Sequence, residues 1–180
     1  MFQRILERLA SELDSRAIPY MVIGGQAVLL YGEPRLTRDI DVTLGVDLGG
    51  LPVVVEAVGA VGLRPRVADV EPFVRRTMVL PCEEPETGIR VDFIFSFSPY
   101  GRQAIERAQR VTVGSTPVRF AALEDLVTHK IIAGRPRDLE DVRTILLKHP
   151  DADDAYVRRW LSEFERTLSE PLVRRFEVLW

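Results

Sequence analysis

Cysteine, histidine and long hydrophobic runs are scarce in this sequence. Its 180 residues include one cysteine, Cys82, and two histidines, His129 and His149. A single cysteine excludes an internal disulfide and is typical of a reducing cytoplasm, and the histidines lie too far apart for a zinc motif. No apolar run approaches the ~20 residues of a membrane helix, and the N-terminus lacks a basic-then-apolar signal pattern. We therefore expect a cytoplasmic protein with no membrane partner.

An overall excess of positive charge is also missing. The formal net charge is −3, which argues against a generally basic, nucleic-acid-binding body. Local arginine pairs do occur, and most are expected to be solvated faces. These pairs are Arg64/Arg66, Arg75/Arg76, Arg135/Arg137, Arg158/Arg159 and Arg174/Arg175. The pair at 135 and 137 is the exception, because it lies beside candidate site residues.

The most informative segment runs from residue 22 to residue 44. An apolar strand enters a turn at Gly24-Gly25, and a short helix and a polar connection then lead to a strand bearing Asp39 and Asp41. Strand side chains alternate between faces, so the two carboxylates share one side. Oxygen ligands held in this way suit a hard divalent cation such as Mg²⁺.

Each half of this pattern has an ordinary explanation. A Gly-Gly doublet is usually only a turn, and Asp-x-Asp is often a strand end. Gly24 and Gly25 lack a Cβ, however, so their backbone can approach a phosphate at the start of a helix. The order and spacing of doublet and acids favour a metal–phosphate site, and we interpret it as a site of nucleotidyl transfer.

The remaining pattern predicts an α+β chain. Helices are expected at 2–15, 26–32, 51–61, 101–109, 122–133, after Pro136 and at 153–168. Further strands are expected at 20–23, 73–80, 89–95 and 111–120, the last with a turn at 114–115. We expect a core at 1–120 and a helical subdomain at 121–180 that packs on it. The apolar C-terminus must pack on the body or on a second copy of the chain.

Asp92 lies in the middle of an otherwise apolar strand. Three interpretations are open: an exposed strand face, an ion pair with Arg90 or another base, or a third metal-site carboxylate. In the C-terminal third, Lys130 falls within an apolar helical stripe, where it either reaches past the core edge or contacts a bound anion. Asp138 and Asp141 lie on one flank of the next helix. Asp138 also stands near the start of that helix, where acids commonly interact with the helix dipole.

These motifs resemble those of the nucleotidyltransferase (polymerase-beta-like) superfamily, and most closely its branch of AbiEii/AbiGii-type toxins and minimal nucleotidyltransferases. The resemblance covers about residues 18–148. Its motifs are matched by Gly24, Gly25, Arg35, Thr37, Asp39, Asp41, Lys130, Arg137, Asp138 and Asp141. It implies a mixed β-sheet flanked by helices, with a C-terminal helical subdomain.

The resemblance also implies the roles of individual residues. Asp39, Asp41 and Asp92 would hold two Mg²⁺ ions, with Mn²⁺ as a substitute, and Asp92 would be the third acid. Lys130 would contact the triphosphate and offset charge on the leaving group. Nucleotide contacts would come from Gly24, Gly25, Thr37, Arg38, Lys130, Asp138 and Asp141.

The expected reaction is therefore the metal-dependent transfer of NMP from an NTP to an acceptor hydroxyl. The acceptor is an RNA or tRNA end, a protein or a small molecule, and the resemblance implies a toxin–antitoxin or phage-defence role with a cognate antitoxin or a homodimer. Two alternatives stay open. One is a catalytically inactive binding or regulatory protein with this fold, and the other is a glycosyltransferase that uses Asp-x-Asp.

Overall fold

The computed structural model describes residues 1–180 and divides into two compact units. The sheet unit comprises residues 1–26 and 37–121, and the helical unit comprises residues 27–36 and 122–180. The sequence pattern places residues 27–36 in the core at 1–120, whereas the structure groups them with the C-terminal helices. No helix is both long enough and apolar enough to cross a bilayer.

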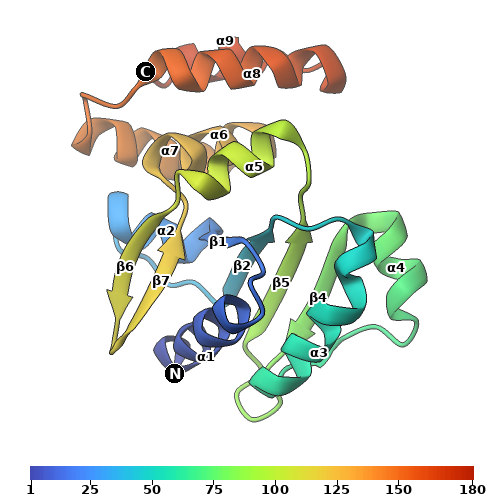
Figure 1. Ribbon diagram of the computed structural model, residues 1–180. Helices are drawn as coiled ribbons and strands as arrows, with labels where there is room; N and C mark the ends of the chain where they lie inside the picture. The colour runs from blue at the N-terminus through green and yellow to red at the C-terminus, as the bar shows by residue number, and fades with distance from the viewer. The chain divides into compact units, whose positions relative to one another are not determined.

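All the strands belong to one mixed sheet in the sheet unit, as Figure 1 shows. Its spatial order is β3 (Arg64–Pro65), β4 (Val79–Glu83), β5 (Arg90–Phe95), β2 (Asp39–Leu44), β1 (Tyr20–Ile23), β7 (Thr116–Phe120) and β6 (Gln109–Val113). The pairs β2–β5 and β1–β7 are parallel, and the other neighbours are antiparallel. The expected α+β class with a mixed sheet and flanking helices is confirmed.

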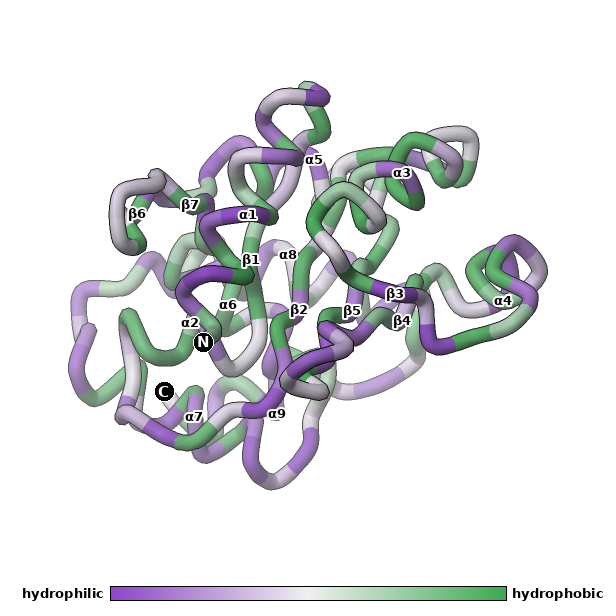
Figure 2. Tube along the Cα trace, turned by 90° about the horizontal axis from the view of Figure 1, so that it is seen from below, coloured by the Kyte–Doolittle hydropathy of each residue, from purple (hydrophilic) through white to green (hydrophobic).

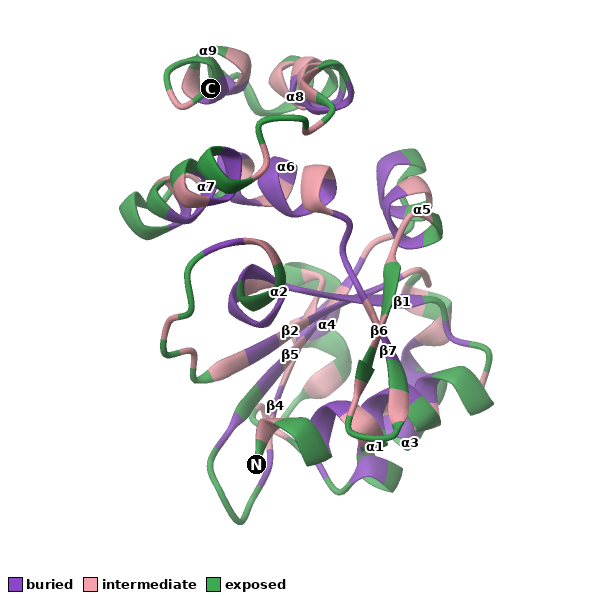
Figure 3. Ribbon diagram, turned by 90° about the vertical axis from the view of Figure 1, so that its left-hand side faces the viewer, coloured by how far each residue is buried: buried purple, intermediate pink, exposed green.

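Central strand β1 is buried along its whole length, whereas the edge strand β6 is largely exposed (Figure 3). Helices α1 (Phe2–Ser15) and α3 (Leu51–Val61) contact each other in this unit and lie on one face of the sheet (Figure 1). The apolar side chains of α1 at 5, 6, 9 and 13 are buried, as its helical periodicity predicts.

Valine-rich α3 shows that packing overrides local preference. Its residues are predominantly hydrophobic (Figure 2), and β-branched side chains favour strands. Leu51, Val54 and Val58 nevertheless recur at helical spacing and are buried. Gly62, in the left-handed region at φ 85°, ends the helix. The short helices η1 (Leu48–Gly50), α4 (Val70–Thr77) and α5 (Pro99–Glu106) complete the connections of this unit.

The strand expected at 73–80 is wrong. The structure has helix α4 over Val70–Thr77, and β4 begins only at Val79. Glu71 in the first turn and Arg75 in the last turn suit the helix dipole, and their side chains form an i,i+4 ion pair at 2.8 Å. Met78 then adopts a left-handed conformation, which ends the helix just before the strand.

The helical unit is built from four C-terminal helices and residues 27–36, which include most of α2 (Gly24–Tyr31). The four helices are α6 (Leu123–Ala133), α7 (Pro136–Lys148), α8 (Asp154–Leu168) and α9 (Leu172–Glu177). Within the unit, α8 and α9 form a layer on α6 and α7 (Figure 1). Leu172 and Phe176 are fully buried, so α9 packs within this unit.

Candidate active site

The predicted acids of β2 and β5 lie on one face of the sheet. These strands are parallel neighbours, with Asp41 opposite Asp92 and Asp39 opposite Arg90. Residues in register on neighbouring strands project to the same face, and the alternate residues project to the other. The alternate residues Val42 and Phe93 are fully buried. Asp92 therefore lies beside the Asp-x-Asp pair rather than behind it.

The glycine turn touches one of these acids, Asp41. Gly24 lies directly after β1, whose last residue, Ile23, is in register with Asp41. Gly24 has a φ of +64°, and a Cβ at this position would overlap the carboxylate of Asp41. Glycine is therefore required here both by backbone conformation and by space. Gly25 is buried in the first turn of α2, where backbone N–H groups lack helical partners.

Asp39 is held by a neighbouring arginine. The Arg90 guanidinium donates from Nε to Oδ1 at 2.9 Å and from Nη2 to Oδ2 at 3.0 Å, so both carboxylate oxygens are engaged. The backbone carbonyl of Asp39 accepts a bond from Thr37 Oγ1 at 3.2 Å. Arg38 is exposed. Of the interpretations considered for Asp92, the ion pair with Arg90 is not observed, because Arg90 pairs with Asp39.

Electrostatics disfavour the ionised form of Asp92. Burial raises the pKa of its carboxyl group, and the negative charge of Asp39 raises it further, while Arg90 and Arg66 act in the opposite direction. The same region raises the pKa of the Cys82 thiol to about 12, through burial and then through the charge of Asp92. A cation bound beside Asp92 would relieve this cost.

We call the side of the sheet that carries Asp39, Asp41 and Asp92 the acid face. It offers carboxylate oxygens, which are the kind of ligand that Mg²⁺ prefers. Asp41 and Asp92 are adjacent, but the side chains as they stand form no group of three or more metal-ligating residues. Both carboxylate oxygens of Asp39 accept hydrogen bonds from Arg90 instead. Three buried polar side-chain atoms of the sheet unit have no hydrogen-bond partner, namely Nε2 of Gln26, Oγ1 of Thr43 and Nε of Arg119.

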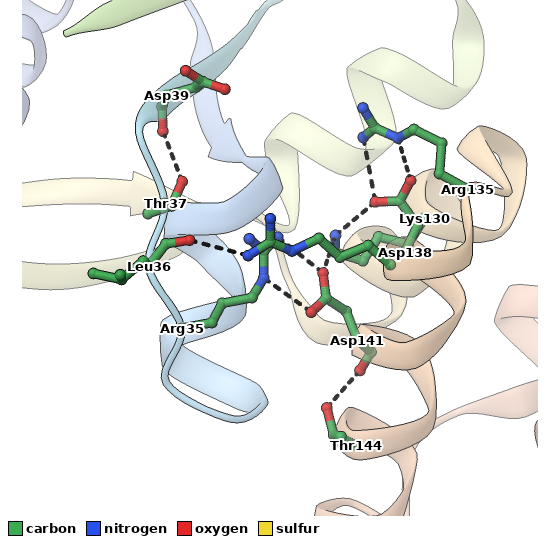
Figure 4. Close-up of polar contacts among 10 residues, drawn as sticks. Arg35, Leu36, Thr37, Asp39, Lys130, Arg135, Asp138, Asp141 and Thr144 are labelled. Atoms are coloured by element: carbon green, nitrogen blue, oxygen red, sulfur yellow. Dashed lines mark hydrogen bonds and ion pairs between the residues drawn. The ribbon is translucent and has the colours of Figure 1, made fainter.

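The other predicted site residues form a separate ionic network in the helical unit (Figure 4). The Lys130 side chain is only 5% exposed, and its Nζ lies 3.0 Å from Asp138 Oδ1 and 2.7 Å from Asp141 Oδ2. Arg35 grips both oxygens of Asp141 at 3.0 Å, and Arg135 binds Asp138. Three cations thus surround two carboxylates.

This network accounts for the conspicuous Lys130 within an apolar stripe. A buried ammonium requires compensating charge, and Asp138 and Asp141 supply it from the next helix. Burial alone would raise the pKa of Asp138, but hydrogen bonds from Arg135 and Lys130 bring it below its usual range. The nucleotide contacts expected of Lys130, Asp138 and Asp141 stay predictions.

Residues 31–36 are anchored by basic side chains of α7 and its C-cap. Lys148 Nζ donates to the carbonyl of Gly32 at 2.8 Å, and His149 Nε2 lies 3.1 Å from the carbonyl of Tyr31. Arg137 donates to the carbonyl of Leu36 at 3.1 Å. These contacts explain why the segment groups with the C-terminal helices. No local sequence signal reveals them, because the partners lie more than a hundred residues apart.

The pairing of Arg90 with Asp39 is the feature of the site that the sequence pattern did not predict. Its position two residues before Asp92 places it on the acid face, which the strand alternation does indicate. The missing information is the β2–β5 register, which sets Arg90 opposite Asp39 rather than opposite Asp41.

Solved structures with the same fold include nucleotidyltransferases. The solution structure of the antibiotic-resistance factor ANT(2'')-Ia has a TM-score of 0.60 at 14% identity, covering 94% of this chain and 98% of that chain. A crystal structure of ANT(2'')-Ia with adenylyl-2''-tobramycin gives 0.58 at 16% identity, covering 81% and 88%. An antigenic nucleotidyltransferase-like protein from Paracoccidioides brasiliensis gives 0.56 at 18% identity, covering 92% and 87%.

The likeness to these structures shows the fold. Comparison with curated proteins gives no match. The family of the nucleotidyl transferase AbiEii toxin, type IV TA system, matches residues 4–178 of the sequence. Because this match spans nearly the whole length, the chain belongs to the AbiEii nucleotidyltransferase toxin family.

Proposed function

We propose that this protein transfers NMP from an NTP to an acceptor hydroxyl and releases pyrophosphate, with Mg²⁺ held by Asp39, Asp41 and Asp92. The observation that carries the proposal is the register of β2 and β5, which sets Asp41 beside Asp92 while the Asp41 carboxylate lies against Gly24. The proposed cation ligands and the glycine turn thus meet in one unit. Family membership favours nucleotidyl transfer over glycosyl transfer.

Each group of site residues is assigned a role in the proposed reaction that follows from its chemistry. Gly24 and Gly25 would donate backbone N–H groups to phosphate oxygens at the start of α2. When bound, two Mg²⁺ ions would offset the charge of the triphosphate and acidify the acceptor hydroxyl. Burial and the charge of Asp39 raise the pKa of Asp92, which makes its carboxylate a stronger base and suits it to accept the hydroxyl proton.

For the acceptor we propose only a chemical class, namely a molecule with a free hydroxyl group. The matching family is described as a toxin of a type IV TA system, which supports a role beside a cognate antitoxin. An RNA or protein acceptor and a cytoplasmic location are part of the proposal. ANT(2'')-Ia is described in complex with adenylyl-2''-tobramycin, which supports a small-molecule acceptor. Homodimer formation stays a prediction.

The test is transfer of label from each α-³²P-labelled NTP, in the presence of Mg²⁺, to total RNA, total protein or an aminoglycoside. We expect label in one acceptor class, loss of at least a hundredfold with Asp41→Ala or Asp92→Asn, and little change with Asp69→Asn. Asp69 is an exposed acid in the same unit whose side chain makes no capping bond, so it controls for the loss of one charge.

Transfer that survives Asp41→Ala would show that the acid face is not the site. An absence of both transfer and Mg²⁺-dependent nucleotide binding would favour the inactive regulatory alternative instead.

A further inference from the structure

The Arg90–Asp39 pair lies at the end of a row of alternating charges across the sheet. Arg90 is in register with Glu83 on β4 and with Asp39 on β2. Glu83 is itself paired with Arg66, at 3.3 Å. Arg90 thus stands between two acids, but its guanidinium fork engages only Asp39.

This pairing competes directly with cation binding. Both oxygens of Asp39 accept bonds from Arg90, while the next row of the same face carries Asp41 and Asp92. A third oxygen ligand becomes available only when Asp39 leaves Arg90. The side chains of Arg90 and Asp39 are 50% and 38% exposed, and an ion pair this open to water is weak enough to be exchanged.

We propose that Arg90 exchanges partners during the reaction: it holds Asp39 before the cation binds, and it contacts phosphate oxygens of the nucleotide after the cation has taken Asp39. The guanidinium fork that fits the Asp39 carboxylate has the geometry that fits two phosphate oxygens. Arg90 also lies on the acid face, two residues from Asp92, so the exchange needs only side-chain rotation. This inference rests on the proposed function.

The exchange predicts opposite effects of one substitution on two ligands. Arg90→Gln removes a competitor and a repelling charge, so Mn²⁺ alone, titrated by the electron paramagnetic resonance of the free ion, should bind about two- to fivefold more tightly. Inorganic tripolyphosphate, titrated calorimetrically in saturating Mn²⁺, should bind more weakly by a similar factor, because the phosphate contact is lost. Arg90→Lys keeps the charge and should restore part of the tripolyphosphate affinity.

Arg75→Gln is the matched control. Arg75 also forms a double-donor contact with an acid, Glu71, in the same unit and is exposed, so the substitution removes the same charge without touching the acid face. It should leave both affinities unchanged.

The outcomes separate this inference from the proposed function. If the wild-type protein binds Mn²⁺ and Arg90→Gln leaves both affinities unchanged, or weakens Mn²⁺ binding, the exchange is wrong and the proposed site stands. If the wild-type protein binds neither Mn²⁺ nor tripolyphosphate, the proposed function fails, and the exchange fails with it. Thermal unfolding of each variant verifies that the fold is retained.

Discussion

Gly24 is under two constraints, one on its backbone conformation and one on the space beside it. Its φ of +64° is costly for a side chain with a Cβ, by about 1–2 kcal/mol. The space that a Cβ would occupy already holds the carboxylate of Asp41. The first constraint affects stability, and the second affects the position of a proposed metal ligand.

Gly24→Ala should therefore lower the free energy of unfolding by about 1–2 kcal/mol and also weaken Mn²⁺ binding, because Asp41 must move. Gly59→Ala is the matched control. Gly59 lies within α3 with nothing near the position of its missing Cβ, so alanine should stabilise the protein by about 0.5–1 kcal/mol. Urea titration monitored by circular dichroism measures the free energy of unfolding of both variants, and titration with Mn²⁺ measures their affinity for the cation. Equal effects of the two substitutions would contradict the account of Gly24.

At the scale of elements, helices α6 and α7 are joined by the buried ionic network of Lys130, Asp138 and Asp141. Gly134, at φ 62°, ends α6, and Pro136 begins α7, so the chain reverses within a few residues and brings the lysine against both acids. A buried ion pair gives little net stability, but the loss of one partner leaves an uncompensated charge.

Lys130→Met should for this reason lower the free energy of unfolding by about 3–5 kcal/mol. Lys148→Met, at the end of α7, removes a lysine whose side chain is 43% exposed, pairs with Glu33 and donates to the carbonyl of Gly32, so its cost should be about 1–2 kcal/mol. Denaturant unfolding compares the two variants. A cost for Lys130→Met no larger than that for Lys148→Met would mean that Lys130 does not serve as the charge partner of the two acids.

Acid should weaken the same network. Because the pKa of Asp138 is lowered in the folded state, its contribution to stability is complete above the ordinary value of 3.8 and is lost as the pH falls through the lowered value. Stability measured by chemical denaturation below about pH 5 should fall less steeply in Asp138→Asn than in the wild-type protein. Parallel curves for the two proteins would contradict the assignment.

For the whole molecule, the sequence pattern predicted most elements and the α+β class, because hydrophobic periodicity is read directly from residues such as those of α1. It failed at α4, although Val70, Phe73 and Val74 recur at helical spacing, because the helix has only eight residues and apolar residues continue directly into β4, which favoured one long strand. For the site, alternation along β2 predicted that Asp39 and Asp41 share a face, and alternation along β5 predicted that Arg90 and Asp92 do. It could not predict the pairing of Arg90 with Asp39, which depends on strand register.

The division of the chain into two units is a second feature of the whole molecule that local sequence patterns do not predict. Residues 27–36 belong to the helical unit because side chains of α7 bind their backbone carbonyls. Contacts over such a separation are set only when the chain has folded. Motif spacing therefore singled out Lys130, Asp138 and Asp141 but did not predict their mutual contacts, and the nucleotide contacts expected of them stay predictions.

The central claim is that the acids of β2 and β5, together with the glycine turn, form one cation-binding site. Cleavage of the backbone by Fe²⁺ and ascorbate, with Fe²⁺ in place of Mg²⁺, tests it directly, because the radicals cut only near the bound ion. The account predicts cuts in three separate segments, near Gly24, within Asp39–Leu44 and within Arg90–Phe95, which excess Mg²⁺ suppresses. Mg²⁺-sensitive cuts confined to other segments, or no such cuts at all, would contradict it.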